Sequence, residues 1–177
     1  PGNLERPLLG IVSRFADQKG FDLIGEVAYQ LAELDISLVV LGSGDLRYEA
    51  LFGNMAAAYP YRIGARIGYD NPLAHRIEAG ADMFLMPSRY EPSGLNQMYS
   101  LRYGTLPIVR ATGGLDDTIE EGTGFKFWDY AGWALLSAVN YALGVYGDRE
   151  RWGGMMRNAM RKDFSWNASA DEYVALY

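Results

Sequence analysis

The chain of 177 residues has the size of one ordinary domain, and 49% hydrophobic with 21% charged residues exclude a disordered or collagen-like protein. A net charge of −6 argues against a general polyanion binder, although it leaves room for a local basic pocket. The absence of cysteine and the single histidine, His75, exclude disulfide scaffolds, thiolate metal sites and multi-histidine metal centres. No apolar run approaches the roughly 20 residues that span a bilayer.

Short apolar runs alternate with longer amphipathic segments along the chain. Residues 1–7 have the composition of a linker and lack the pattern of a signal peptide. Buried-strand patterns occur at residues 8–13, 36–41, 61–68, 83–86, 106–110 and 124–127. Helical spacing between them predicts helices at residues 21–33, 46–59, 73–79, 95–103 and 115–121. A mainly helical tail is expected over residues 131–177.

This alternation predicts an α/β fold with a doubly wound, mostly parallel sheet of the Rossmann-like class. Parallel neighbours need a crossover connection, and the helical segments between the strands supply it. No repeat, low-complexity tract or internal linker divides the chain, so residues 1–177 are expected to form a single domain. Ligands of such sheets bind outside the carboxyl ends of the strands, so the loops that leave the strands carry the candidate site.

Polar residues follow the first three predicted strands. Arg14 and Lys19 flank a loop that enters a helix, and two cations there suit a pyrophosphate, with a pair of solvated charges as the alternative. Gly42 and Gly44 would allow close backbone approach to a ligand, or would serve an ordinary turn. Tyr69 could stack on a base or a sugar, although packing is the commoner role of a tyrosine.

The loop after the fourth strand is the most informative part of the sequence. Gly94 would let backbone N–H groups face a ligand oxygen, with Asn96 nearby as a phosphate donor. Glu91 would accept hydrogen bonds from hydroxyls at the mouth of the site, or would stabilise a helix N-terminus as an ordinary carboxylate. Thr112 and Gly113, after the fifth strand, face the same edge or form a turn before a helix.

Several of these segments match one family in chain order. They are SRFADQKG at 13–20, LGSGD at 41–45, IGY at 67–69, PSRYEPSGLNQ at 87–97, TGGLDDT at 112–118 and DFSW at 163–166. Each segment alone is weak, whereas the ordered set is highly specific. Over nearly its whole length the chain resembles the C-terminal domain of bacterial glycogen synthases and plant starch synthases, which are ADP-glucose-dependent glycosyltransferases of the two-domain GT-B fold.

The resemblance implies an enzyme that transfers glucose from ADP-glucose to the non-reducing end of an α-1,4-glucan with retention, without a cofactor or an essential metal. It implies that Arg14 and Lys19 neutralise the diphosphate and stabilise the leaving ADP, and that Glu91 binds glucose hydroxyls. The nucleotide- and sugar-binding positions carried over from the family are Ser13, Gly42, Gly44, Tyr69, Gly94, Leu95, Asn96, Thr112 and Gly113.

Within that set, the resemblance assigns the distal phosphate to the backbone at Gly94 and Leu95 together with Asn96, and it places Tyr69 against adenine. Tyr99 occupies the position where many related transferases have a second glutamate, which fits the glycogen and starch synthase branch. Asn96 also departs from the threonine that is usual in the family, but it keeps a small polar side chain.

The resemblance further implies that an N-terminal GT-B domain is absent from these residues. The chain alone is therefore expected to bind ADP or ADP-glucose and to catalyse poorly, because catalysis needs donor and acceptor held together. The expected partners are the nucleotide, an α-1,4-glucan and the missing domain, with no nucleic acid and no membrane. Residues 119–123 form a shorter segment than the family usually has. The expected location is the cytoplasm for a bacterial protein and the plastid for a plant starch synthase.

Two alternatives stay open at this point. The chain could be the donor domain of another sugar-nucleotide transferase, such as a sucrose synthase-like enzyme that uses UDP-glucose. It could also be a non-catalytic domain that binds a glucan or a protein partner. The sequence does not decide between ADP and UDP, and it carries no signal for the oligomeric state.

Overall fold

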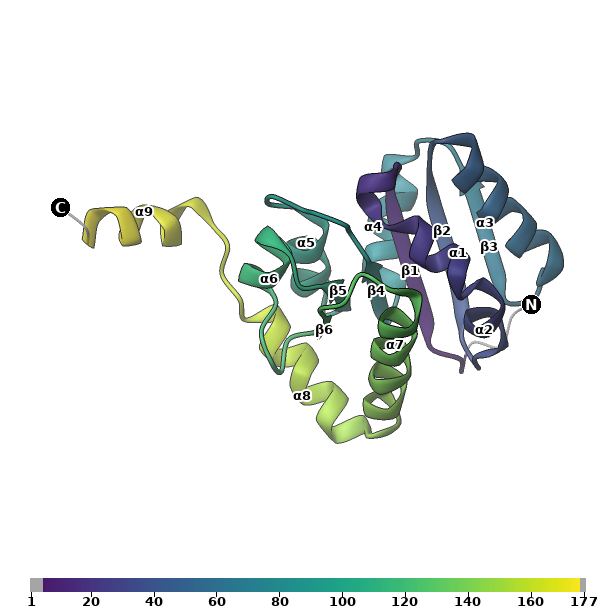
Figure 1. The fold of residues 1–177 in the computed structure, drawn as a ribbon. Coiled ribbons are helices and arrows are strands. Elements are labelled where there is room, and N and C mark those ends of the chain that lie inside the picture. The colour runs from purple at the N-terminus through teal and green to yellow at the C-terminus, as the bar shows by residue number, and fades with distance from the viewer. Residues whose placement is uncertain (1–4, 176–177) are drawn as a thin grey trace.

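Six short apolar segments form one sheet, because aliphatic and aromatic residues suit strands that are buried on both faces. The strands are β1 (Leu8–Phe15), β2 (Ser37–Gly44), β3 (Ile63–Ile67), β4 (Met83–Met86), β5 (Leu106–Arg110) and β6 (Phe125–Phe127). The computed structural model describes residues 5–175 and orders the strands β3-β2-β1-β4-β5-β6, with all neighbouring pairs parallel (Figure 1). The strand order reverses between β1 and β4, so the doubly wound, Rossmann-like sheet is confirmed.

Helices cover both faces of the sheet (Figure 1). The helical elements are the 3₁₀ turn η1 (Asp17–Lys19), α1 (Phe21–Glu26), α2 (Ala28–Glu33), α3 (Leu46–Ala58), α4 (Asn71–Gly80), α5 (Asn96–Tyr103), α6 (Gly113–Thr118), α7 (Gly132–Gly147), α8 (Arg149–Met160) and α9 (Trp166–Ala175). One face carries α1, α3 and α7, and the other carries α4 and α5. Helix α9 extends away from the rest of the chain (Figure 1). Among residues 5–175 no helix is long and apolar enough to cross a membrane.

A cluster of three phenylalanines anchors the carboxyl end of β1. The rings of Phe15, Phe21 and Phe52 are fully buried, and their centroids lie 5.1–5.4 Å apart. Each ring contributes about 2 kcal/mol of burial free energy, with a further gain from the edge-to-face contacts. Because these residues belong to β1, α1 and α3, the cluster fixes the connection from β1 to α1, which carries Lys19.

Strands β1 and β2 extend further than the sequence predicts. Their pairing continues as far as Phe15 and Gly44, so Arg14, Gly42 and Gly44 lie in strands and not in loops. A Cβ on Gly42 or Gly44 would collide with the backbone of β1, which explains why β2 can approach β1 so closely at this point. These glycines were expected to let a ligand approach the backbone. In the structure they let strand β1 approach it instead.

Other boundaries also differ from the sequence prediction. The helix expected over residues 21–33 is divided at Val27 into α1 and α2, where the start of α7 packs against Glu26 and Val27. Residues 1–4 of the linker-like start and residues 176–177 of the expected helical tail lie outside the described residues. Strands β4 and β5 have the predicted bounds.

Candidate functional site

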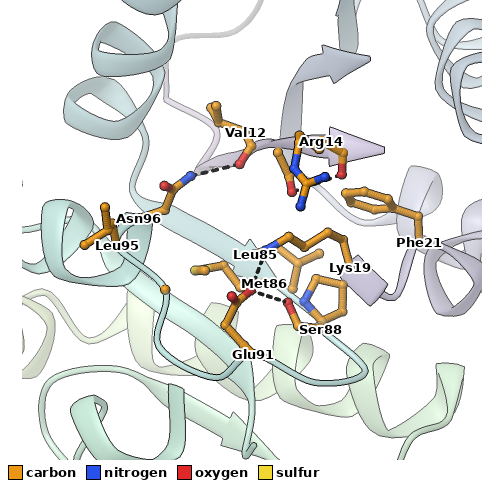
Figure 2. Close-up of a pocket in the computed structure, with 13 residues that line it drawn as sticks. Val12, Arg14, Lys19, Phe21, Leu85, Met86, Ser88, Glu91, Leu95 and Asn96 are labelled. Atoms are coloured by element: carbon orange, nitrogen blue, oxygen red, sulfur yellow. Dashed lines mark hydrogen bonds and ion pairs between the residues drawn. The ribbon is translucent and has the colours of Figure 1, made fainter. Parts of the chain in front are cut away.

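A cavity of about 220 Å³ opens at the carboxyl ends of β1 and β4, where the strand order reverses (Figure 2). Its walls come from β1, from the connection between η1 and α1, and from the loop between β4 and α5. The lining residues are Val12, Ser13, Arg14, Lys19, Phe21, Leu85, Met86, Pro87, Ser88, Glu91, Gly94, Leu95 and Asn96. The structure therefore brings together Arg14, Lys19 and Glu91, which the sequence separates by as many as 77 positions.

Lys19 and Glu91 form an ion pair within this cavity. The lysine Nζ lies 2.5 Å from Glu91 Oε2, and the two side chains are 18% and 8% exposed. Ser88 Oγ donates a second hydrogen bond to the same carboxylate oxygen at 3.3 Å. Gly20 follows Lys19 with φ 73°, and a Cβ there would collide with the carbonyl of Pro87. Only a glycine lets η1 pack against the loop after β4, so the ion pair depends on this close approach.

Arg14 is an exposed cation at the end of β1 that points toward the same space as Lys19 (Figure 2). It forms no ion pair with any described residue, unlike Lys19. The lining thus contains two cations and one carboxylate, an excess of one positive charge in a chain of net charge −6. An unpaired guanidinium beside a partly enclosed cavity suits a phosphate or carboxylate ligand.

The turn before α5 presents backbone N–H groups at this cavity. Gly94 has φ 78°, and the N–H groups of Gly94 and Leu95 have no acceptor among the described residues. Asn96 Nδ2 donates to the carbonyl of Val12 at 3.0 Å, which fastens the start of α5 to β1. One amide hydrogen of Asn96 is used in this way, and the other remains for a ligand.

A second cavity of about 200 Å³ adjoins the first across the end of β1. Ser13, Arg14 and Asn96 line both cavities, while Gly42 and Tyr69 line only the second. Tyr69 is 90% exposed, so its ring is not part of the core. The two cavities together form a site with a charged part at Lys19 and a more apolar part at Tyr69.

Thr112 and Gly113 are not brought into either cavity. Gly113 has φ 47° and packs on the backbone of Glu91, and the N–H of Gly114 donates to the Glu91 carbonyl at 2.9 Å. Gly44 also lies outside both linings. Gly113 and Gly44 support the site from outside it, because the backbone of Glu91 lies against Gly113 and the backbone of β1 lies against Gly44.

A cluster of side chains that the sequence does not predict holds the loop of Glu91. Arg89 donates to Asp22 at 3.1 Å, Tyr130 Oη donates to the same carboxylate at 2.5 Å, and Arg110 donates to the Arg89 carbonyl at 2.6 Å. Both guanidinium groups lie over the Tyr130 ring. Burial, followed by the bond to Asp22, raises the pKa of Tyr130. No local motif signals this cluster, because its members come from separate elements of the chain.

Comparisons with known proteins agree with this architecture. The family described as Glycosyl transferases group 1 matches residues 2–158. A glycogen synthase of Koribacter versatilis is 60% identical, in a match that covers 97% of this chain and 37% of the relative. A glycogen synthase of Anaeromyxobacter dehalogenans is 54% identical, in a match that covers 100% of this chain and 38% of the relative. The structure of the catalytic domain of Starch Synthase IV from Arabidopsis thaliana, bound to ADP and acarbose, has a TM-score of 0.84 and 35% identity over 97% of this chain and 38% of its own.

The chain thus spans a little over a third of the length of the curated relatives that it matches. The sheet order, the crossover at the cavity and the family match over residues 2–158 agree with the resemblance drawn from the motifs. By sequence and fold, this chain belongs to the group 1 glycosyl transferases.

Proposed function

We propose that this chain is the donor-binding domain of a glycogen or starch synthase, which transfers glucose from ADP-glucose to the non-reducing end of an α-1,4-glucan. The observation that carries the proposal is the pair of adjoining cavities at the strand crossover, with Arg14 unpaired between them. A nucleoside diphosphate sugar has the matching parts: a flat base, a charged diphosphate and a polar sugar. The relatives named glycogen synthase and the ADP-bound starch synthase support this choice of substrate class.

In this proposal the diphosphate lies at the cavity shared by β1 and β4. Arg14 and Lys19 supply two cations, and the free N–H groups at Gly94 and Leu95 supply neutral donors for the distal phosphate. Negative charge grows on the diphosphate as the bond to the sugar breaks. Donors fixed in advance stabilise that charge more than they stabilise the bound substrate, which lowers the barrier to transfer.

Glu91 would accept hydrogen bonds from the glucose hydroxyls at the other wall of the cavity. Its carboxylate is held by Lys19 and Ser88, and its loop is tied to α1 through Arg89 and Asp22. The carboxylate therefore keeps a fixed position, as a sugar-orienting group requires.

Tyr69 would contact the base at the second cavity, with Gly42 and Ser13 beside it. An exposed aromatic ring gives a base a flat apolar surface and loses little of its own packing when a ligand binds. The proposal includes no cofactor and no metal. The expectation that neither is needed comes from the resemblance to the family and stays a prediction.

This chain spans a little over a third of the length of its relatives. We assign the transfer reaction to a longer protein that also contains the remaining part. The chain alone presents the donor site at the open edge of one sheet, and the glucan must be held opposite it for reaction. The expected activity of the chain alone is therefore very low.

Isothermal titration calorimetry of the 177-residue chain with ADP tests the proposal. We expect saturable binding of ADP that is weakened when Arg14 and Lys19 are both replaced by alanine, and weaker binding of UDP. Tighter binding of UDP would favour another sugar-nucleotide transferase. Binding of maltohexaose with no binding of ADP or UDP at millimolar concentration, by a chain shown to be folded, would favour the non-catalytic alternative.

A further inference from the structure

The side chain of Gln97 is fully buried directly behind the turn at Ser93 and Gly94. Its Nε2 lies within hydrogen-bonding distance of three acceptors, which are the carbonyls of Ser93 at 3.0 Å and Gly94 at 3.2 Å and Thr118 Oγ1 at 3.3 Å. Because the amide has two hydrogens, one of them is shared between two of these acceptors. Thr118 Oγ1 uses its own hydrogen on the Gly114 carbonyl, so it can only accept from the amide. One amide group therefore joins the turn before α5 to helix α6.

We propose that Gln97 is a positioning residue, whose amide orients the backbone N–H groups of Gly94 and Leu95 toward the distal phosphate of the nucleotide. This inference rests on the proposed function above, because it concerns the same donor site. Gln97 does not line either cavity, so it would act through the turn and not by contact with the ligand.

The geometry of the peptide group carries the argument. The peptide bonds at this turn are trans, so each carbonyl and the N–H on the same peptide plane point in opposite directions. The Ser93 carbonyl shares its plane with the Gly94 N–H, and the Gly94 carbonyl shares its plane with the Leu95 N–H. Both carbonyls point to Gln97 in the interior, so both N–H groups point the opposite way, toward the cavity that Gly94 and Leu95 line.

A second observation indicates that this arrangement serves more than packing. Gln97 Oε1 is buried and has no hydrogen-bond partner among the described residues. An unpartnered buried acceptor costs free energy, and an apolar side chain of similar length would avoid that cost. Such a violation of the usual rule is expected at functional positions, where the donor side of the amide is needed.

Calorimetry with ADP and AMP on the 177-residue chain separates positioning from a merely structural role. AMP lacks the distal phosphate, so it does not engage the oriented N–H groups. For Gln97→Met, which keeps the side-chain length and loses the amide, we expect ADP affinity to fall about tenfold while AMP affinity stays within about twofold. Gln97→Glu, which keeps the volume but loses the donor, should give the same selective loss and serves if the methionine variant does not fold.

Thr105→Val is the matched control. Thr105 is also buried and bonded to two carbonyls, those of Glu78 and Ala81, but it lines neither cavity. This variant should lower thermal stability without changing the ratio of ADP to AMP affinity. A folded Gln97 variant whose ratio equals that of the wild type would overturn the inference. If the wild-type chain bound ADP no better than AMP, that result would contradict the site for the distal phosphate itself, and the proposed function with it.

Discussion

Lys19 and Glu91 neutralise each other inside the cavity, with 2.5 Å between Nζ and Oε2. Under the proposed function the lysine binds a phosphate and the carboxylate binds sugar hydroxyls, so the two groups have different targets in the same ligand. When the donor binds, its phosphate must therefore replace part of the attraction between Lys19 and Glu91. The carboxylate attracts the lysine at the same place where the phosphate competes for it, and this competition gives a measurable prediction.

Glu91→Gln should separate the two roles. The substitution removes the charge that competes with phosphate for Lys19. A net loss of about 1 kcal/mol of competing attraction should raise ADP affinity about three- to tenfold. Under the proposed function, transfer from ADP-glucose by a protein that contains this domain should fall, because the glucose contact is weakened. Calorimetry with ADP and a glucan-extension assay measure the two effects.

Glu33→Gln serves as the control for the Glu91 variant, because Glu33 is an exposed glutamate in α2 that lines neither cavity. The same loss of one negative charge there should leave ADP affinity within about twofold, since exposed charges are screened by salt. Weaker ADP binding by the Glu91 variant, at unchanged thermal stability, would contradict the competition between carboxylate and phosphate.

Arg14→Ala should weaken ADP binding with little effect on stability. The guanidinium is exposed and forms no ion pair with a described residue, so its removal leaves no buried group unpaired. A charge-assisted contact to phosphate is worth about 1.5–3 kcal/mol, which corresponds to a loss of roughly 10- to 100-fold in affinity. Arg76→Ala is the control, because Arg76 is an exposed arginine in α4 that lines neither cavity, and it should change neither property. Equal losses in the two variants would show a general effect of charge.

The sequence was sufficient to predict the sheet and the edge of the sheet at which the cavity lies. Alternation of short apolar runs with helical segments predicts parallel strands, and the carboxyl ends of those strands lie where the cavity is found. Four residues of the ordered motifs, Arg14, Lys19, Glu91 and Gly94, line one cavity in the structure. Local chemistry and the chain order of the loops were enough to predict that these residues lie at one edge of the sheet.

The supporting contacts could not be predicted in the same way. Asp22 and Tyr130 are 108 positions apart and meet only because α1 and α7 pack side by side. Gly42 could not be interpreted from the sequence either. A glycine after a predicted strand suggests a turn, whereas in the structure Gly42 lies in β2 and makes close contact with β1. Both outcomes depend on which elements become neighbours, which the local pattern of residues does not specify.

Gly42→Ala should destabilise the fold through the contact between β1 and β2. A Cβ at this position would collide with the Ser13 carbonyl and approach Phe15 Cε1 to 2.7 Å. Relief requires the strands to separate, at a cost of about 1–3 kcal/mol in the free energy of unfolding. Gly64→Ala in β3 is the control, because nothing lies within 4 Å of its Cβ. Urea unfolding should show a large loss for the first variant and almost none for the second.

Glu78 should make the free energy of unfolding fall as the pH rises, which is the opposite of the usual effect of a carboxylate. Its side chain is buried in α4, 3.6 Å from His75 Nδ1, and burial raises the pKa of its carboxyl above the ordinary value of 4.5, with His75 opposing part of the shift. The folded chain therefore holds this proton more tightly than the unfolded chain. The contribution of Glu78 to stability is complete below pH 4.5 and is lost as the pH rises through the raised pKa.

Glu78→Gln, which is neutral at every pH, should therefore be more stable than the wild type at pH 7. The advantage should shrink as the pH is lowered, because the wild-type carboxyl becomes neutral as well. Urea unfolding at pH 7 and at pH 4 measures both effects, and the exposed Glu33→Gln variant reports the background change in charge. If the Glu78 variant were less stable than the wild type at pH 7, the carboxylate would be making a favourable interaction that outweighs its burial, with His75 as the partner to test next.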